Sequence, residues 1–407
     1  MIYERLLENQ ILEVSKTFPV LMLIGARQTG KTTLLDKIAR SEGIDREYVS
    51  FDNPTVRLSA KTDPEKFLQI HKPPIILDEV QYVPELLPFI KILVDKNRRM
   101  GDFWLTGSQN FSLVNSAAES LAGRVGILNL FGLSNAEISS KNFGAFETDI
   151  DRLIERKKST DDIDAEKIYE RILKGSYPHL YEIDNVNLKT FYESYIDTYL
   201  SRDIRTLSQV ADEMLFLSFL KILATRSASN LNYDEISKLV GVSAPTIKSW
   251  VSILVSSGII FLIDPLLSNP TKKVTKAKRM YFADTGLLSF LLEYDNIRMI
   301  DTGNMSGMIF ETYVVSELYK SYINANKRVP MYYYRDGNQK EIDIVIYENE
   351  VATPVEIKKS TNPSNPAKNF NVLLENNLKV NNGLIICMTN DIQPVNKNDY
   401  LVPVTVI

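Results

Sequence analysis

The sequence predicts an α/β fold built on a parallel sheet, and three observations lead to this prediction. The apolar run 20–24 is followed directly by a glycine-rich loop and then by a stretch with helical spacing. A second apolar run, 75–77, ends in two acids. Strand-length apolar runs then alternate with helical segments up to residue 131, as expected where helices connect the parallel strands of one sheet.

The glycine-rich loop carries the most specific motif of the chain. Residues 25–32 contain two glycines separated by four residues, then Lys31 and Thr32, the pattern of a phosphate-binding loop. Glycines let backbone N–H groups turn inward around an anion, and the helix that follows adds its positive end. Lys31 is placed to reach the outer phosphates, and Thr32 offers a hydroxyl to Mg²⁺. The predicted nucleotide-binding residues are Gly25, Ala26, Arg27, Gln28, Thr29, Gly30, Lys31, Thr32 and Thr33.

The acids after the second apolar run complete a nucleotide site. A strand buried on both faces reads as a continuous apolar run, and acids at its carboxyl end point to the ligand crevice of an open sheet. Asp78 is therefore predicted to hold Mg²⁺, and Glu79 to orient and deprotonate the attacking water. The alternative is a pair of surface acids after a core strand.

The next predicted strand, 103–109, ends in polar residues. In ATPases with a phosphate loop, a polar side chain at this strand's tip contacts the γ-phosphate or the attacking water. Thr106 and Ser108 both qualify, and the sequence does not separate them. The alternative is a polar strand end that faces solvent. A fifth strand is predicted at 127–131.

These motifs together resemble one family. Residues 25–32, 75–81, 105–108 and 121–124 look like the AAA-type ATPase module of a large prokaryotic group that also carries a C-terminal DUF4143 domain. The resemblance implies a five-stranded core that binds ATP and Mg²⁺. It also implies an arginine that acts on the γ-phosphate, from the same chain or a neighbour. Arg124 and Arg202 match arginine positions of the group, and the alternative for each is a structural ion pair.

Composition narrows the class of protein. A net charge of −4 argues against a protein that coats nucleic acid through bulk charge. One cysteine, Cys387, cannot form an internal disulfide, and His71 and His179 are the only imidazoles, so a zinc site is improbable. The N-terminus lacks the features of a signal peptide, and no stretch reaches the roughly 18 apolar residues of a membrane span. We expect a cytoplasmic protein.

Residues 134–230 are predicted to form a mostly helical lid over the nucleotide, and residues 231–300 a winged helix-turn-helix. Gly241 ends one helix and Ser243 caps the next, and two strands follow. Residues 201–290 hold eleven Lys and Arg against seven Asp and Glu, which favours a polyanion such as DNA. The candidate DNA contacts are Lys248, Lys272, Lys273, Lys276, Lys278 and Arg279. The alternative is a packing module with a solvated wing, because a helix offering little beyond Lys248 is poor in base-reading side chains.

Two further short motifs are typical of the same prokaryotic group. The first, Gly175-Ser176-Tyr177-Pro178, breaks the helical pattern of the predicted lid. The second begins at Asp284, which is predicted to cap a helix.

The C-terminal segment, 301–407, is predicted to fold as a helix, three strands, a helix at 365–378 and a last strand. Asp343 precedes Glu356 by thirteen residues, which suits adjacent antiparallel strands with their carboxylates side by side. Glu356 and Lys358 share one strand face. This arrangement looks like the PD-(D/E)xK nuclease fold, although Ile342 replaces the motif's proline.

That second resemblance implies a metal site. Glu311, Asp343 and Glu356 would bind a second Mg²⁺, and Lys358 would position or activate the attacking water. The alternatives are a nuclease-like fold that has lost its activity, or acids on a solvated strand face. The chain as a whole is thus predicted to contain an ATPase core (1–133), a helical lid (134–230), a winged helix (231–300) and a nuclease-like domain (301–407). Its partners are left open between DNA, a protein and further copies of the chain.

Overall fold

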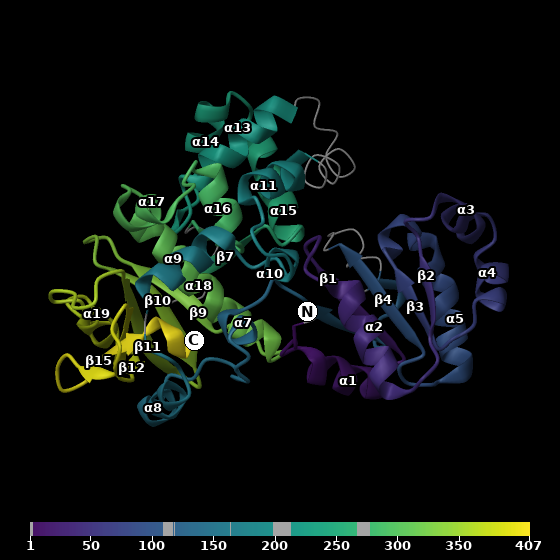
Figure 1. The fold of residues 1–407 in the computed structure, drawn as a ribbon, viewed down its shortest axis with the longest axis horizontal. Helices are drawn as coiled ribbons and strands as arrows, with labels where there is room; N and C mark the ends of the chain where they lie inside the picture. The colour runs from purple at the N-terminus through teal and green to yellow at the C-terminus, as the bar shows by residue number, and fades with distance from the viewer. Residues whose placement is uncertain (1–2, 109–116, 118, 163, 198–212, 267–276) are drawn as a thin grey trace.

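The computed structural model describes residues 3–108, 117, 119–162, 164–197, 213–266 and 277–407. They form two bodies, an N-terminal lobe (residues 3–133) and a C-terminal body (residues 134–407), which lie side by side in Figure 1. The N-terminal lobe has its own apolar clusters on the two faces of its sheet. One large cluster in the C-terminal body draws buried side chains from residues 145 to 407.

The N-terminal lobe contains the predicted five-stranded parallel sheet. Its strands are β1 (Val20–Gly25), β2 (Glu47–Ser50), β3 (Ile75–Asp78), β4 (Phe103–Ser108) and β5 (Val125–Asn129). They are ordered β2-β3-β4-β1-β5, and every neighbouring pair is parallel. The carboxyl ends therefore meet at one edge of the sheet, where the glycine-rich loop follows β1, a strand with neighbours on both sides.

Helices cover both faces of this sheet. They are α1 (Glu8–Thr17), α2 (Lys31–Glu42), α3 (Pro54–Thr62), α4 (Pro64–Ile70) and α5 (Leu87–Asn97). The helix expected from Val83 begins only at Leu87, after two short 3₁₀ turns. Val83 has φ −139° and precedes Pro84, which disfavours a helical conformation at that residue.

The helices of the predicted lid segment belong to the C-terminal body. They are α7 (Asn135–Ile138), α8 (Ile150–Lys158), α9 (Ala165–Lys174), α10 (His179–Glu182), α11 (Leu188–Tyr195) and α13 (Glu213–Ala224). Except for α7, their buried side chains share the large cluster with α16 (Thr285–Leu291), α17 (Ile297–Thr302) and α18 (Ser306–Asn324). The segment 134–230 is mostly helical as predicted, and most of its helices bury their apolar faces in that core. Within the described part of these helices and their connections, the segment around Ser176 and Pro178 approaches the glycine-rich loop.

Two helices with the predicted helix-turn-helix spacing lie in this body. α14 (Tyr233–Val240) ends at Gly241, whose φ is 84°, and α15 (Ala244–Ser256) is capped by the side chain of Ser243. The direction of the chain bends by 103° between the two helices. Among the described residues, no single helix is long and apolar enough to cross a bilayer, although this bent pair meets the length and composition test. Ile236 and Trp250 of this pair are buried in the core of the body.

The strands after these helices join a sheet that runs across the predicted boundary at residue 300. β7 (Ile260–Pro265) pairs antiparallel with β8 (Arg279–Phe282), and also parallel with β9 (Met331–Arg335) of the C-terminal segment. The full order is β14-β15-β13-β11-β10-β9-β7-β8-β6. Two predicted domains are therefore continuous through backbone hydrogen bonds, and β8 lies within reach of the C-terminal acids.

The remaining strands are β10 (Glu341–Glu348), β11 (Val351–Lys358), β13 (Gly383–Cys387) and β15 (Asp399–Pro403), with the short strands β6 (Ser229–Asn230), β12 (Lys379–Val380) and β14 (Gln393–Pro394). Of these, β10, β11 and β13 were predicted, whereas β15 and the short strands were not, and β13 is not the last strand of the chain. The helix expected at 365–378 is only α19 (Asn371–Glu375). Asn365 has φ 43°, which is outside the right-handed helical region, and a residue that precedes a proline disfavours that region as well, so the helix does not start at Asn365.

Candidate functional site

The glycine-rich loop has the geometry of an anion cradle. Gly30 has φ 89°, a left-handed conformation that favours glycine, and it caps α2. A Cβ added at Gly25 would lie 2.2 Å from the carbonyl oxygen of Leu130, so no larger residue fits there. The Lys31 ammonium donates hydrogen bonds to the carbonyls of Gly25 (3.1 Å) and Ala26 (2.9 Å), which holds it over the loop.

Asp78 lies at the centre of a hydroxyl cluster beside this loop. Its carboxylate accepts hydrogen bonds from Thr32 (2.8 Å) and from Thr106 on one oxygen. The other oxygen accepts from Tyr48 (2.8 Å) and Ser50 (3.3 Å). Thr32 and Asp78, which were each predicted to bind Mg²⁺, are therefore in direct contact, and the buried carboxylate with its adjacent hydroxyl fits the hard oxygen ligands that Mg²⁺ prefers.

Tyr48 and Ser50 were not predicted. They lie two residues apart on β2, and Ser50 is directly opposite Asp78 in the β2–β3 register. Residues two apart on a strand share one face, so their spacing was a usable signal. Only the order of strands in the sheet shows that this face meets Asp78.

Glu79 follows Asp78 in an unusual backbone conformation. Its φ is 59°, which is uncommon outside glycine and asparagine and is found at functional sites. Its N–H donates to the hydroxyl of Thr106 over 3.2 Å, and its carboxylate accepts a hydrogen bond from the amide of Gln81. Thr106 thus contacts both predicted acids. Ser108 closes β4, and its side chain lies outside the described part of the chain.

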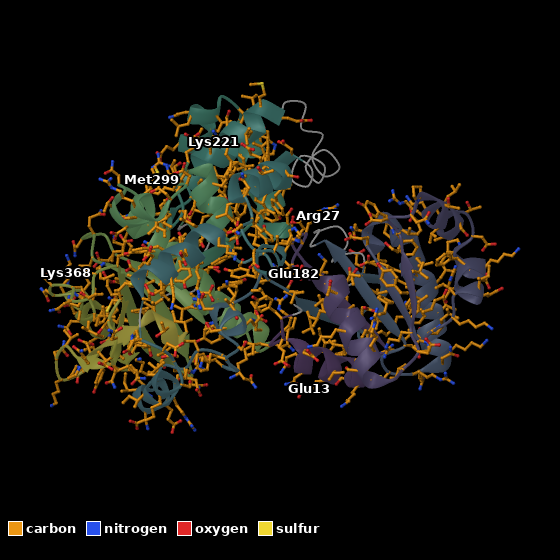
Figure 2. All side chains as sticks on the ribbon, in the orientation of Figure 1. Glu13, Arg27, Glu182, Lys221, Met299 and Lys368 are labelled. Atoms are coloured by element: carbon orange, nitrogen blue, oxygen red, sulfur yellow. The ribbon has the colours of Figure 1, made fainter. Side chains whose placement is uncertain are left out.

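Two arginines flank Tyr82 close to this site. Arg27 of the loop donates to the Tyr82 hydroxyl over 3.2 Å, and the Arg57 guanidinium lies 4.1 Å from the centre of the Tyr82 ring. Arg27 lies on the side of the N-terminal lobe that faces the C-terminal body (Figure 2). Tyr82 therefore connects the loop to the segment after Glu79, in addition to the contact between Thr32 of the loop and Asp78.

Neither arginine predicted to act on the γ-phosphate is seen at the described part of the site. Arg124 precedes β5 and its carbonyl accepts the N–H of Val20, so it lies at the amino ends of the strands. A strand the length of β1 separates the two edges by about 16 Å. The Arg124 guanidinium pairs with Asp95, which is the structural alternative and excludes action on the loop of the same chain. Arg202 lies outside the described residues.

The candidate DNA contacts divide into three groups. Lys248 is exposed on α15, and Lys278 is half-exposed and pairs with Asp264 over 3.1 Å. Lys272, Lys273 and Lys276 lie outside the described residues. Arg279 is corrected: it is 2% exposed and its guanidinium pairs with Glu341 and, at 3.8 Å, with Glu311. A buried and paired side chain cannot contact DNA.

The C-terminal acids gather as the sequence indicated. β10 and β11 are antiparallel with Ile344 opposite Val355, so Asp343 and Glu356 lie at neighbouring positions across the strands. The Lys358 ammonium is 2.7 Å from Glu356 and 4.0 Å from Asp343. Glu311 on α18 accepts a hydrogen bond from the Tyr281 hydroxyl over 2.9 Å.

Burial raises the pKa values of these acids. Burial, and then the nearby Asp343 carboxylate, raise the pKa of Glu311 to about 8 and that of Glu356 to about 7. Burial also raises the pKa of Asp343. Burial would lower the pKa of Lys358, but Asp343 and Glu356 outweigh it and raise the value. Mutual repulsion of this kind is what a divalent cation would relieve.

The side chains of Glu311, Asp343 and Glu356 are not arranged as a metal centre in this structure. Within the described residues, no three Asp, Glu, His or Cys side chains are arranged to hold a metal ion. The cations of Arg279 and Lys358 take up the carboxylate oxygens instead. The donor chemistry therefore fits Mg²⁺, whereas ligation would need at least one of these ion pairs to open.

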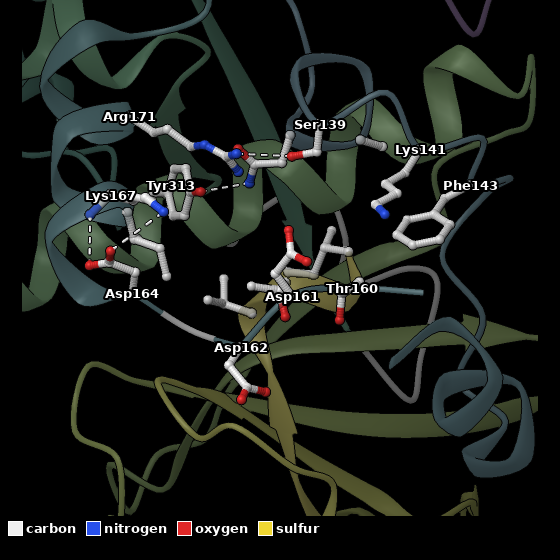
Figure 3. Close-up of a pocket in the computed structure, with 16 residues that line it drawn as sticks. Ser139, Lys141, Phe143, Thr160, Asp161, Asp162, Asp164, Lys167, Arg171 and Tyr313 are labelled. Carbon is white, nitrogen blue, oxygen red and sulfur yellow. Dashed lines mark hydrogen bonds and ion pairs between the residues drawn. The ribbon is translucent and has the colours of Figure 1, made fainter. Parts of the chain in front are cut away.

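A small cavity lies elsewhere in the C-terminal body, between α7, α9 and the end of the chain (Figure 3). Its volume is about 110 Å³. Among its lining residues, Lys167 pairs with Asp164 at 3.7 Å and Arg171 donates to Ser139 over 2.9 Å. Its Lys167 and Arg171 cations are thus already partnered within the wall.

Comparison with known proteins gives matches to three family models. Residues 17–139 match an AAA domain, residues 306–407 match the domain of unknown function DUF4143, and residues 165–298 match the domain of unknown function DUF8612. The AAA match covers the parallel sheet with the glycine-rich loop, and the DUF4143 match covers the C-terminal mixed sheet.

Similar proteins are known from bacteria and archaea. Uncharacterized proteins of Mycobacterium bovis and Mycobacterium tuberculosis are each 27% identical over 349 residues, which is 85% of this chain and 71% of each relative. The Walker-type ATPase of Pyrococcus abyssi aligns with 71% of this chain and 96% of its own, at 15% identity and a TM-score of 0.45. The RuvB Holliday junction branch migration motor of Thermotoga maritima aligns with 62% of this chain and 86% of its own, at 16% identity and a TM-score of 0.29.

Proposed function

We propose that this chain, which joins an AAA-type P-loop ATPase domain to a C-terminal DUF4143 domain, binds ATP with Mg²⁺ and hydrolyses the γ-phosphate. The observation that carries the proposal is the 2.8 Å hydrogen bond between Thr32 and Asp78. It brings the last residue of the phosphate loop to the acid at the end of β3, where Mg²⁺ is held in enzymes of this class.

The roles follow from the geometry of the site. Backbone N–H groups of the loop and Lys31 would bind the phosphates, and Thr32 and Asp78 would hold Mg²⁺, which would supply positive charge to the phosphates. Glu79 accepts a proton from the attacking water. The Thr106 hydroxyl forms hydrogen bonds with the Glu79 N–H and with Asp78, so it fixes the positions of the two acids relative to each other.

ATP turnover measured with purified protein tests the proposal. Lys31→Ala should abolish turnover, and Lys37→Ala on the same helix provides a matched control because Lys37 pairs with Glu8 away from the loop. Turnover that survives Lys31→Ala at the wild-type rate would refute the assignment. The same assay with and without DNA shows whether nucleic acid regulates hydrolysis.

We further propose that the C-terminal body acts on DNA. Support comes from the 103° helix pair with Lys248 exposed on its second helix, and from the acids beside Lys358. In this proposal Glu311, Asp343 and Glu356 hold Mg²⁺ and Lys358 positions the attacking water. A DNA mobility-shift assay over a range of salt tests binding, since phosphate contacts are strongest at low salt. Absence of binding at low salt would reject it.

Cleavage is tested separately from binding. Mg²⁺-dependent nicking should be lost in Asp343→Ala, and nicking that persists in this variant would come from another site or protein.

The competing proposal is a nucleotide-dependent switch that binds a protein partner. It is favoured by the mixed surface of α14, where Asp234, Glu235 and Lys238 are exposed beside Leu239 at 56% exposure.

A further inference from the structure

Arg5 reaches the phosphate loop from the N-terminal segment, outside every motif of the site. Its guanidinium donates to the carbonyl of Thr29 over 2.8 Å and to the carbonyl of Phe131 over 2.7 Å. Its Nε donates to Glu137 over 2.9 Å. Arg5 is only 7% exposed, so these partners replace the water that a guanidinium would otherwise bind. We call Arg5, Thr29, Phe131 and Glu137 the Arg5 junction.

The bond to Thr29 constrains the part of the loop that would bind phosphate. In a trans peptide, the C=O and the N–H lie in one plane and point in opposite directions. Because Arg5 holds the Thr29 carbonyl, the N–H of Gly30 is directed away from Arg5. Gly30 also has no Cβ and a φ of 89°, so by itself it restricts this peptide little. Arg5 thus supplies an orientation that the loop sequence lacks.

Glu137 fixes Arg5 from the other side. One of its oxygens accepts from Arg5 and from the Leu6 N–H, both at 2.9 Å. The other accepts from the Ser134 N–H at 2.8 Å, and Ser134 in turn caps α7. Glu137 is 3% exposed, and charge-assisted bonds of this kind are strong and directional. The position of Arg5 therefore depends on the start of α7.

The start of α7 is held in turn by α18. The Asn135 N–H donates to Glu317 over 2.8 Å, and the Lys320 ammonium donates to the Leu133 carbonyl over 3.0 Å. Asn135 also donates to the hydroxyl of Tyr313, which stands at the edge of the cavity in Figure 3. α18 is the helix that carries Glu311, about 9 Å from Glu317 along the helix axis. A continuous run of buried polar contacts thus connects Thr29 to the helix of the C-terminal acids.

We propose that Arg5 is a positioning residue for the phosphate loop. We also propose that, through the Arg5 junction, the affinity for ATP depends on the position of α18 in the C-terminal body. The proposal rests on ATP binding at the loop. By linkage, a contact that raises affinity for ATP is itself strengthened when ATP binds. The nucleotide then tightens the contact between the two bodies, and hydrolysis releases it.

The test measures the affinity of the full-length protein for a fluorescent, non-hydrolysable ATP analogue with Mg²⁺. Arg5→Met removes all three donor contacts, and the dissociation constant should rise about tenfold, the equivalent of about 1.4 kcal/mol. Arg5→Lys keeps the charge without the planar fork and should give an intermediate loss. Arg40→Met is the matched control, because Arg40 is exposed on α2 and pairs with Asp36 of the same helix.

A fourth variant addresses the connection to the C-terminal body. Glu317→Gln changes no residue of the N-terminal lobe, and it should weaken binding of the analogue about threefold because Asn135 loses a charged acceptor. Backbone amide exchange provides the reciprocal measurement. The Leu6 and Asn135 amides should exchange more slowly with the analogue bound, and this protection should vanish in Lys31→Ala.

The outcomes separate the two claims. Wild-type affinity in a folded Arg5→Met protein would overturn the positioning role, even if its melting temperature fell. If Arg5→Met does not unfold cooperatively, unchanged affinity in Arg5→Lys and Glu317→Gln overturns it instead. Wild-type affinity in Lys31→Ala would show that the analogue binds elsewhere, which refutes the ATP site and not the junction alone.

Discussion

The hydroxyl of Tyr48 donates a 2.8 Å hydrogen bond to Asp78, the acid that also accepts from the loop residue Thr32. Tyr48 lies on edge strand β2, and its side chain is partly exposed although its hydroxyl reaches a buried carboxylate. The bond to Asp78 helps to raise the pKa of Tyr48, after the larger effect of burial. The tyrosine therefore stays protonated and serves as a fixed donor to the carboxylate.

Tyr48→Phe should weaken Mg²⁺ binding while leaving the phosphate cradle intact. Groups that orient a metal ligand typically contribute at least tenfold to metal affinity, so the Mg²⁺ concentration for half-maximal ATP binding should rise about tenfold. Affinity for ATP in chelator should stay at the wild-type value. Tyr347→Phe on β10 is the control. An unchanged Mg²⁺ requirement would show that Thr32 and Thr106 suffice to orient Asp78.

Glu79→Gln should separate ATP binding from hydrolysis. The amide cannot accept the proton of the attacking water, so turnover should fall by about a hundredfold or more. Binding of ATP should persist, because Lys31, Thr32 and Asp78 are unchanged. Glu85→Gln, at an exposed position after the same strand, is the matched control. Single-turnover kinetics would measure the effect, and full activity in Glu79→Gln would assign the base elsewhere.

Arg279 and Lys278 are adjacent in sequence and should behave in opposite ways. Arg279→Met leaves Glu311 and Glu341 without their buried cation, which should cost about 3–5 kcal/mol of unfolding free energy. Lys278→Met breaks a half-exposed pair with Asp264 and should cost less than about 1 kcal/mol. Urea unfolding measures both.

DNA binding should show the reverse order for the same pair. If the C-terminal body binds DNA, Lys278→Met should lower affinity and reduce the salt dependence by about one ion. A conservative Arg279→Lys variant that remains folded should retain the wild-type salt slope. A slope changed by Arg279→Lys and unchanged by Lys278→Met would contradict this assignment.

The stability of the C-terminal body should fall as pH rises. The pKa of Glu311 is raised from an ordinary 4.5 to about 8 in the folded state, so this state binds more protons than the unfolded chain between those values. The contribution of Glu311 to the free energy of unfolding is fully present below about pH 4.5 and is lost as the pH rises to about 8. Each pKa unit corresponds to about 1.4 kcal/mol. Urea unfolding in the presence of a chelator, repeated from pH 5 to pH 8, measures how the free energy of unfolding changes with pH.

Glu311→Gln should flatten this slope, because the amide carries no titrating proton. Glu350→Gln, at an exposed turn of the same body, should leave it unchanged. A slope that persists in Glu311→Gln would assign the titration to Glu356 or Asp343. Added Mg²⁺ should have its largest stabilising effect at the alkaline end, where the carboxylates are charged.

Much of the proposed ATP site was predictable because its residues are close in sequence. The loop, Lys31 and Thr32 form one continuous motif, and Asp78 and Glu79 follow an apolar run directly. The pairing of Asp343 with Glu356 was likewise predictable, since the residues follow each other on an antiparallel hairpin. Local backbone preferences and strand alternation decide these features, and both can be read from a linear pattern.

Other predictions depended on packing and changed with the structure. Arg124 follows a motif of the group, yet it lies at the amino ends of the strands and pairs with Asp95. Arg279 belongs to a lysine-rich segment, yet β8 adjoins the C-terminal acids and buries it. Charge counted along a sequence does not show which cations are already neutralised by acids from distant elements.

By itself, the sequence determined a phosphate loop, its acidic partner and a hairpin of carboxylates, because each is a local pattern with a known chemical use. Tertiary structure alone decided that Tyr48 and Ser50 face Asp78, and that Arg5 holds the loop from a segment without a motif. These contacts join residues that are 24 to 132 positions apart. They arise from strand order and burial, where an unpaired polar group is costly and must find whatever partner the fold brings near.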